Sequence, residues 1–170
     1  TMTLMAWFNP RSVASGHIVN KHNGTTNGYY INLTNGDISA TYGEVTAGST
    51  QRTITSTGAP VSANNWYHVA ITVDTSNFKL YLNGLEKASA AGFGQATSPS
   101  NDFNIGRSAS AANYFDGFID DVAFYNKALT EAEIIKFGSG RQQPYVAASA
   151  PYNYETNLTG LWPFDGNNLD

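Results

Sequence analysis

The chain has 170 residues, no cysteine and a formal net charge of −4. This length is enough for one domain with a buried core, and the lack of cysteine excludes disulfides, thiolate metal sites and a cysteine nucleophile. The negative charge and the absence of a basic stripe argue against a nucleic-acid-binding surface, and no apolar run approaches the roughly 20 residues that span a bilayer. Many Gly, aromatic and small polar residues with few charges instead predict an all-β protein.

The first part of the chain contains four segments that predict strands. Residues 3–8 are apolar on both faces, which is typical of a strand buried between layers. A second strand is expected at residues 17–21. Strands at residues 29–34 and 37–42 are separated by Asn35-Gly36, which is a strong signal for a tight hairpin turn. The pattern therefore predicts antiparallel neighbours rather than helices.

The middle of the chain continues the strand pattern. Two runs of alternating apolar residues, separated by a turn at residues 75–77, predict a hairpin. The first run is Tyr67, Val69, Ile71 and Val73, and the second is Phe78, Leu80 and Leu82. A short strand is expected at residues 103–106, followed by a loop of small residues at 108–113.

An acidic strand and a capped helix follow in residues 115–135, FDGFIDDVAFYNKALTEAEII. A period of two predicts a strand whose successive side chains point to opposite faces. One face would carry Phe118, Asp120, Val122 and Phe124, and the other Ile119, Asp121, Ala123 and Tyr125. Thr130 and Glu133 have the spacing of a capping box, which predicts a helix start. Gly138 is expected to end the helix.

The composition changes after residue 140. Residues 141–157 are rich in Pro, Ala, Ser and Tyr and predict an extended linker. Residues 158–170 then resume with an apolar strand and a turn. We therefore expect one domain at residues 1–140 with about seven or eight strands and one short helix near its C-terminal end, arranged as an antiparallel sandwich.

Two segments resemble a known family. Residues 65–84 carry a Trp, Val-Ala, Asp, Leu-Tyr, Asn-Gly series, at Trp66, Val69-Ala70, Asp74, Leu80-Tyr81 and Asn83-Gly84. Residues 115–134 carry a Gly-x-Ile-Asp strand followed by Leu-x-x-x-Glu-Ile. With the Ala-Trp strand near the start, these segments resemble laminin-G-like domains of the concanavalin A-like lectin/glucanase superfamily. The resemblance covers residues 3–137 and implies an extracellular, antiparallel jelly-roll β-sandwich.

The C-terminal segment departs from the family pattern. The sequence GLWPFDGNNLD at residues 160–170 resembles a strand that stands at the beginning of these domains, so the first strands of residues 1–140 are missing from the N-terminus. Residues 158–170 either open a next repeat or complete a sandwich by strand addition. The completed sandwich could be that of the same chain or of a neighbouring copy.

The resemblance also implies a structural calcium ion. Its ligands would be Asp120 of the acidic strand, with Asp165 and the carbonyl oxygen of Gly166, and Asp121 is the alternative to Asp120. Under the other interpretation, Asp120 and Asp121 only cap loops or pair with Lys or Arg. If residues 158–170 come from a neighbour, the calcium ion would bridge two chains.

Aromatic and amide side chains suggest a carbohydrate site. Tyr30 and Asn32 are expected on the outward face of the first hairpin, and Asn113 and Tyr114 in the loop before the acidic strand. Sugar sites combine aromatic surfaces with such donors and acceptors. Alternatively, tyrosines at strand spacing only pack against neighbouring strands.

The sequence gives little reason to expect catalysis. Asp116 and Asp120 have a spacing that a glycosidase could use, but Asp116 lies in a tight turn. The three histidines, His17, His22 and His68, are expected to be isolated from one another.

We therefore predict an extracellular, non-catalytic module that binds glycans within a larger surface or secreted protein. One alternative is a self-assembling subunit of a filament or array, in which residues 158–170 dock onto a neighbouring copy. Another is an accessory domain of a polysaccharide-degrading enzyme.

Overall fold

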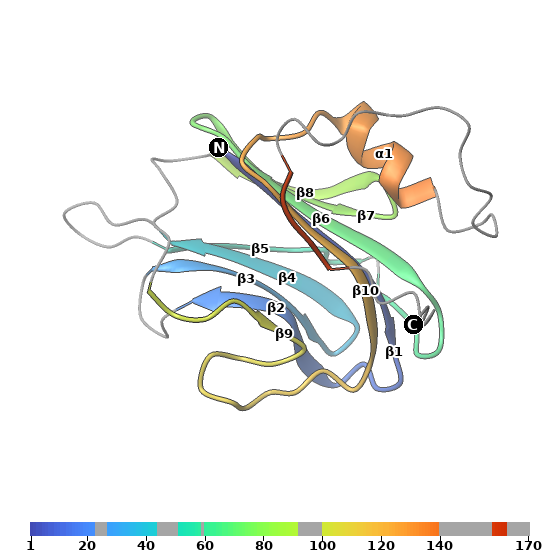
Figure 1. Cartoon of the computed structure of the whole chain (residues 1–170). Helices are drawn as coiled ribbons and strands as arrows, with labels where there is room; N and C mark the ends of the chain where they lie inside the picture. The colour runs from blue at the N-terminus through green and yellow to red at the C-terminus, as the bar shows by residue number, and fades with distance from the viewer. Residues whose placement is uncertain (23–26, 44–50, 59, 92–99, 140–157, 163–170) are drawn as a thin grey trace, which may run out of the picture.

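Two antiparallel β-sheets pack face to face (Figure 1) in the computed structural model, which describes residues 1–22, 27–43, 51–58, 60–91, 100–139 and 158–162. The six strands of the first sheet are, in spatial order, β11 (Leu158–Trp162), β10 (Gly117–Tyr125), β1 (Met2–Pro10), β6 (Tyr67–Val73), β7 (Asn77–Leu82) and β8 (Leu85–Ala91). The five strands of the second are β5 (Gln51–Thr55), β4 (Asp37–Gly43), β3 (Gly28–Thr34), β2 (Ser15–His22) and β9 (Asn104–Ile105). The predicted all-β antiparallel sandwich is confirmed.

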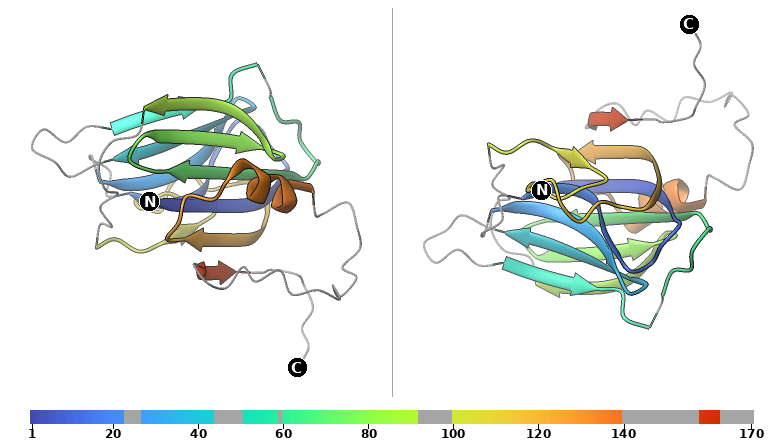
Figure 2. Two further views of the ribbon diagram at one scale, coloured as in Figure 1. Left: turned by 90° about the horizontal axis from the view of Figure 1, so that it is seen from above. Right: turned by 90° about the horizontal axis from the view of Figure 1, so that it is seen from below.

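The main core lies between the two sheets. Outside the bulges, alternate residues of the strands face inward, and large, fully buried side chains among them include Tyr42, Phe8, Phe78, Ile31, Ile71 and Leu80. A smaller cluster lies on the outer face of the six-stranded sheet, where helix α1 (Glu131–Ser139) packs through Ile134 (Figure 2). Strand β1 is therefore buried on both faces, as its apolar sequence predicts, because Leu4 enters the main core and Met5 the smaller cluster.

The predicted hairpin turns are present. Asn35 and Gly36 have φ values of 51° and 86°, which is the backbone of the tight turn that an Asn-Gly pair favours. In the β6–β7 turn, the Asp74 carboxylate accepts hydrogen bonds from the amides of Ser76 (2.7 Å) and Asn77 (2.6 Å). The Asn-Gly backbone in the first turn and the Asp74 side-chain bonds in the second fix the register of the two hairpins.

Two strands were not predicted, and both are sheet edges. β5 ends the five-stranded sheet and β8 ends the six-stranded sheet. Their sequences, QRTIT and LEKASAA, contain few large apolar residues because most of their side chains are exposed or half-buried. Edge strands with polar or charged residues resist pairing with other chains, and they give a weak signal in the sequence.

A β-bulge in β10 breaks the predicted alternation. The partners of β10 on β1 shift register between Met5 and Trp7, and Asp121 has a positive φ of 46°. The residues that pack toward the main core are Ile119, Val122 and Phe124, whereas Ala123 and Tyr125 join the cluster under α1. The predicted grouping of Phe118 and Asp120 with Val122 and Phe124 is therefore wrong, because the bulge adds one residue to the strand.

The capping box of the helix is confirmed. The Thr130 amide donates to a Glu133 carboxylate oxygen (2.7 Å), and the Glu133 amide donates to the Thr130 hydroxyl (3.3 Å). The helix ends one residue beyond Gly138. A Cβ at Gly138 would lie 2.6 Å from the backbone nitrogen of Gly84, so this glycine allows the helix to approach the β7–β8 turn. No described helix is long and apolar enough to cross a bilayer.

The strand predicted after the linker pairs with β10 as the outermost strand of its sheet. Leu158 is the partner of Tyr125 and Trp162 is the partner of Val122. The pairing is within one chain (Figure 1). The predicted linker at residues 141–157 and the turn after Trp162 lie outside the described residues.

Candidate functional site

A cavity of about 470 Å³ opens on the outer face of the five-stranded sheet. Its described lining comes from β2, β3, the start of β5 and the segment on either side of β9: His17, Asn20, His22, Tyr30, Gln51, Asn101, Ser108, Ala109, Ser110 and Asn113. These side chains are amides, hydroxyls, imidazoles and one phenol, with Ala109 as the apolar exception. The volume is in the range of small-molecule sites.

A β-bulge in β2 builds one wall of the cavity. The β3 partners of His17 and Val19 are consecutive residues, so Ile18 is an extra residue in β2. Ile18 and Val19 are both fully buried in the core. The bulge thereby places three side chains of β2 together in the cavity wall: His17, Asn20 and His22.

Tyr30 packs between two of these side chains. Its ring centroid lies 5.0 Å from that of His17 and 5.3 Å from that of His22, the second contact being edge to face. Asn20 is the direct cross-strand partner of Tyr30. The phenol ring is therefore held by neighbours on β2 before any ligand binds.

Asn20 bonds to the imidazole of His17 and to the backbone of His22. Its side chain is buried, and its Nδ2 donates to His17 Nδ1 (3.2 Å) while its Oδ1 accepts from the His22 amide (3.1 Å). Gln51 Nε2 lies 2.7 Å from His22 Nε2. Burial lowers the pKa of His17, with a smaller contribution from the nearby charge of His22, and burial also lowers the pKa of His22. Both rings are therefore neutral near pH 7.

The loop after β9 forms a second wall. Within it, the Ser108 amide and hydroxyl both donate to the Ala112 carbonyl oxygen, at 2.9 and 2.8 Å. The Asn113 carbonyl oxygen accepts a hydrogen bond from the His17 amide (3.0 Å). Ala111 and Asn113 have positive φ values of 53° and 49°, so the loop turns tightly. These bonds tie the loop to β2 at the edge of the cavity.

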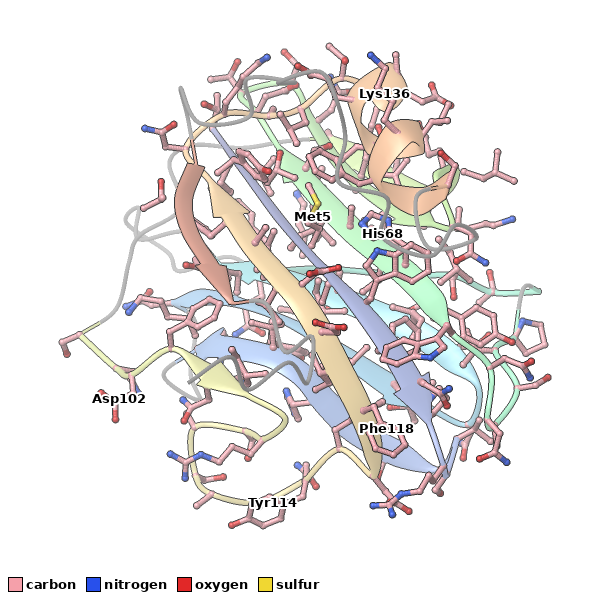
Figure 3. The ribbon with its side chains drawn as sticks, turned by 45° about the vertical axis from the view of Figure 1, so that its right-hand side comes forward. Met5, His68, Asp102, Tyr114, Phe118 and Lys136 are labelled. Carbon is pink, nitrogen blue, oxygen red and sulfur yellow. The ribbon has the colours of Figure 1, made fainter. Side chains whose placement is uncertain are left out.

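The four residues predicted to bind carbohydrate are not all in one place. Tyr30 and Asn113 line the cavity. Asn32 lies two residues from Tyr30 on β3, opposite His17. Its Nδ2 donates to Thr34 (3.0 Å), and its buried Oδ1 has no hydrogen-bond partner among the described residues. Tyr114 is 63% exposed and projects away from the cavity (Figure 3).

Hydroxyl pairs extend the polar surface across β4 and β5. The hydroxyls of Ser39 and Thr55 lie 2.9 Å apart, and those of Thr41 and Thr53 lie 2.8 Å apart. Thr41 is the cross-strand partner of Tyr30. The outer face of this sheet is therefore polar and uncharged at these positions beside the cavity.

Two of the four predicted metal ligands, Asp120 and Asp121, lie on β10 of the other sheet. Asp120 is buried on β10 opposite Trp7, and its Oδ1 accepts a hydrogen bond from the Asp121 amide (2.8 Å). Asp165 and Gly166 lie outside the described residues. The part of the chain that the structure describes contains no group of three His, Asp or Glu side chains that could hold a metal. Calcium takes six to eight oxygen ligands from carboxylates, carbonyls and water, so a site at Asp120 would need further ligands beside the carboxylates of β10.

The histidines and Asp116 also have defined places. His17 and His22 are not isolated, contrary to the prediction, because both contact Tyr30, and the bulge in β2 brings His22 to the face of His17. His68 lies on the other sheet beside Trp7 (ring centroids 5.3 Å apart; Figure 3). Asp116 forms an exposed ion pair with Arg11 (2.9 Å). A strict period of two would have placed His17 and His22 on opposite faces, and no local motif announces the bulge.

The sequence of residues 1–135 matches the model of the concanavalin A-like lectin/glucanases superfamily. The chain belongs to this family. The match covers β1 to β10 and the first five residues of helix α1, and stops short of β11. No curated protein sequence matches the chain.

Three solved structures are similar to this member of the superfamily. One is a Bacteroides ovatus protein to which carbohydrate binding is attributed (TM-score 0.62, 22% identity). The second is domain 4 of AbnA, an extracellular arabinanase of Geobacillus stearothermophilus, in complex with arabinotriose (TM-score 0.60, 22% identity). The third is a heptameric pentraxin of Limulus polyphemus (TM-score 0.56, 15% identity).

The likeness to these proteins extends over most of this chain but only part of theirs. It covers 79% of this chain and 40% of the Bacteroides protein, 81% and 66% for the arabinanase domain, and 81% and 69% for the pentraxin. At these identities the likeness establishes the fold.

Proposed function

We propose that this domain is a non-catalytic glycan-binding module and that the cavity around Tyr30 is its binding site. The observation that carries the proposal is the chemistry of the lining, in which a held aromatic ring is surrounded by neutral amides, hydroxyls and imidazoles. Sugar rings combine an apolar C–H face with hydroxyls that both donate and accept hydrogen bonds. Tyr30 matches the first property, and Asn20, Asn113 and Ser108 match the second.

The lining also favours binding over catalysis. Glycosidases use a pair of carboxyl groups on either side of the scissile bond. The described residues that line the cavity include no Asp or Glu. Asp116 and Asp120, which have a suitable spacing in the sequence, belong to the segment that leads into β10 and to β10 itself, which is in the other sheet.

The neighbours support a place for this domain in extracellular glycan recognition. The arabinanase domain is part of an extracellular enzyme and was solved with a bound oligosaccharide. We therefore propose an extracellular, adhesive role within a larger surface or secreted protein, and the same neighbour favours the alternative of an accessory domain in a polysaccharide-degrading enzyme. Arabinotriose is accordingly one of the first ligands to test.

A second candidate role is self-assembly through residues 158–170. Strand β11 is held at the edge of its sheet by pairing with β10 from Val122 to Tyr125. A strand held at an edge in this way can be supplied equally by the same chain or by another copy. The proposed calcium ion at Asp120 would lie on this same strand β10 and requires further ligands beyond the described residues.

Binding to a glycan array, followed by titration calorimetry with the best ligand, tests the proposed function. We expect Tyr30→Ala to weaken binding by at least about tenfold, equivalent to about 1.4 kcal/mol, because the ring that packs on the sugar is lost. Tyr114→Ala is the matched control, since this tyrosine is exposed outside the cavity, and it should bind like the wild type. Equal binding by the Tyr30→Ala variant would place the site elsewhere.

A further inference from the structure

We infer that the cavity selects uncharged saccharide units over their anionic counterparts, and that His17 and His22 set this selection. The inference rests on the proposed function and goes further by naming the class of ligand. The same sugar chain often occurs in an uncharged and an anionic form, with a methyl ester or hydroxyl in place of a carboxylate or sulfate. The cavity is built to distinguish these forms for three reasons.

First, no fixed charge belongs to the described lining. The charged side chains on the elements around the cavity are Lys21 on β2, Asp37 on β4, Arg52 on β5, and Asp102, Arg107 and Asp116 in the segment between β8 and β10, and none of them is among the lining residues. Lys21, Arg52 and Arg107 each adjoin a lining residue in sequence, and the Lys21 Nζ donates to the backbone carbonyl oxygen of Asn101 (2.7 Å). This contact engages the ammonium group with the backbone at the edge of the cavity, while the Lys21 side chain is not among the lining residues.

Second, the two imidazoles are held in their neutral form by geometry. His17 Nδ1 is the acceptor for the Asn20 amide group, and His22 Nε2 is the acceptor for the Gln51 amide group. A ring nitrogen that accepts a hydrogen bond carries no proton, so the proton of each ring is on its other nitrogen. Protonation of His17 at Nδ1 would cost it this hydrogen bond, because the Asn20 amide oxygen already accepts from the His22 amide, and burial opposes the charge on both rings.

Third, an anion in this cavity would lose hydration without gaining a counter-charge. A buried carboxylate or sulfate is costly unless it is paired with a cation. The only cation that the described lining can supply is an imidazolium, which requires uptake of a proton by His17 or His22. An uncharged unit needs no such proton. The selection should therefore be strong above pH 7 and should relax as the pH falls below the ordinary histidine pKa.

Matched glycan pairs test the inference directly. We would compare methyl-esterified with de-esterified oligogalacturonides, and desulfated with sulfated oligosaccharides, on an array at pH 8.0 and pH 5.5. For any backbone that binds, the uncharged member should bind at least about tenfold more tightly at pH 8.0, and this ratio should shrink at pH 5.5. Equal or tighter binding of the anionic member at pH 8.0 would overturn the inference but leave the proposed function intact. Binding to no glycan on the array would overturn both.

The double variant His17→Gln, His22→Gln separates the role of the imidazoles from that of the cavity shape. Glutamine offers amide donors and acceptors and cannot be charged. In this variant the affinity for the uncharged glycan, relative to that for its anionic counterpart, should therefore remain high at both pH values. A ratio that still shrinks at pH 5.5 in this variant would show that other groups control it. Tyr114→Ala, outside the cavity, should follow the wild type at both pH values. The wild-type ratios decide the inference even if the double variant binds weakly.

Discussion

The ring centroids of Tyr30 and His17 lie 5.0 Å apart, on neighbouring strands of the five-stranded sheet. His17 lies opposite Asn32, which shares a face of β3 with Tyr30, and the extra residue Ile18 brings the residues after it onto this same face, beginning with Asn20 opposite Tyr30. His22 reaches the other neighbouring position at Tyr30 for the same reason. A single bulge therefore assembles the aromatic centre of the proposed glycan site.

Asn20→Ala should destabilise the fold as well as weaken binding. The side chain is only 3% exposed and satisfies the buried amide of His22. Leaving that donor without its acceptor should cost about 1–3 kcal/mol of the free energy of unfolding, measured by urea denaturation. Asn113→Gly is the control, because its side chain is exposed, its link to His17 runs through the backbone, and glycine tolerates its positive φ of 49°. An unchanged midpoint for Asn20→Ala would contradict the positioning role.

The fold could be predicted from the sequence wherever local signals agree with tertiary packing. Asn35-Gly36, the alternating hairpin at residues 67–82 and the Thr130–Glu133 box each determine local structure through bonds within a few residues. The edge strands β5 and β8 could not be predicted in this way, because edges bury little and carry no apolar stripe.

The site was only partly predictable for a different physical reason. Tyr30 and Asn113 follow from strand alternation and from loop composition. The contribution of His17 and His22 depends on the bulge at Ile18, and the faces of β10 depend on the bulge at Asp121. Each bulge reverses the alternation downstream, and neither has a sequence signal as strong as an Asn-Gly turn.

Acid should destabilise the protein in part through His68. Burial lowers the pKa of this histidine from 6.5 to about 3, and both its ring nitrogens lack hydrogen-bond partners in the described structure. Below pH 6.5 the unfolded chain therefore takes up a proton that the folded protein does not, and stability falls as the pH decreases from 6.5 toward 3. The lowered pKa values of His17 and His22 act in the same direction.

His68→Phe tests this account by thermal unfolding between pH 7 and pH 4. The variant keeps an aromatic ring beside Trp7 and removes the titrating group, so its Tm should fall less with acid than that of the wild type. For a chain of this length, a difference of 1 kcal/mol in the free energy of unfolding should change the Tm by about 2–4 °C. Parallel Tm curves for the two proteins would show that His68 does not contribute.

Removal of residues 158–170 should expose the edge of β10. An unpaired edge strand is a template for pairing with another chain, and Val122 to Tyr125 would lose their partners from β11. We expect a lower Tm and the appearance of dimers or larger species in light scattering after size exclusion. Addition of a peptide of residues 158–170 should restore the monomer. A truncated chain that stays monomeric with an unchanged Tm would contradict a role for this segment in completing the sheet.

The proposed calcium ion should stabilise the fold if Asp120 binds it. For a dissociation constant of about 0.1 mM, typical of extracellular modules, 10 mM calcium should add about 2.7 kcal/mol, or roughly 5–10 °C in Tm. Asp120→Asn should abolish this increase. Asp116→Asn, which only removes an exposed ion pair with Arg11, should retain it. A wild-type Tm that does not respond to calcium would rule out the metal site.

The position of a bound glycan is the most direct test of the central proposal. Amide chemical shifts in two-dimensional NMR would be followed during titration of ¹⁵N-labelled protein with the tightest ligand from the array, beginning with arabinotriose. The account predicts that the largest changes fall on His17, Asn20, Tyr30 and the loop that carries Asn113. Changes concentrated around Phe118 and Trp66 on the opposite sheet, or no changes with any glycan, would contradict it.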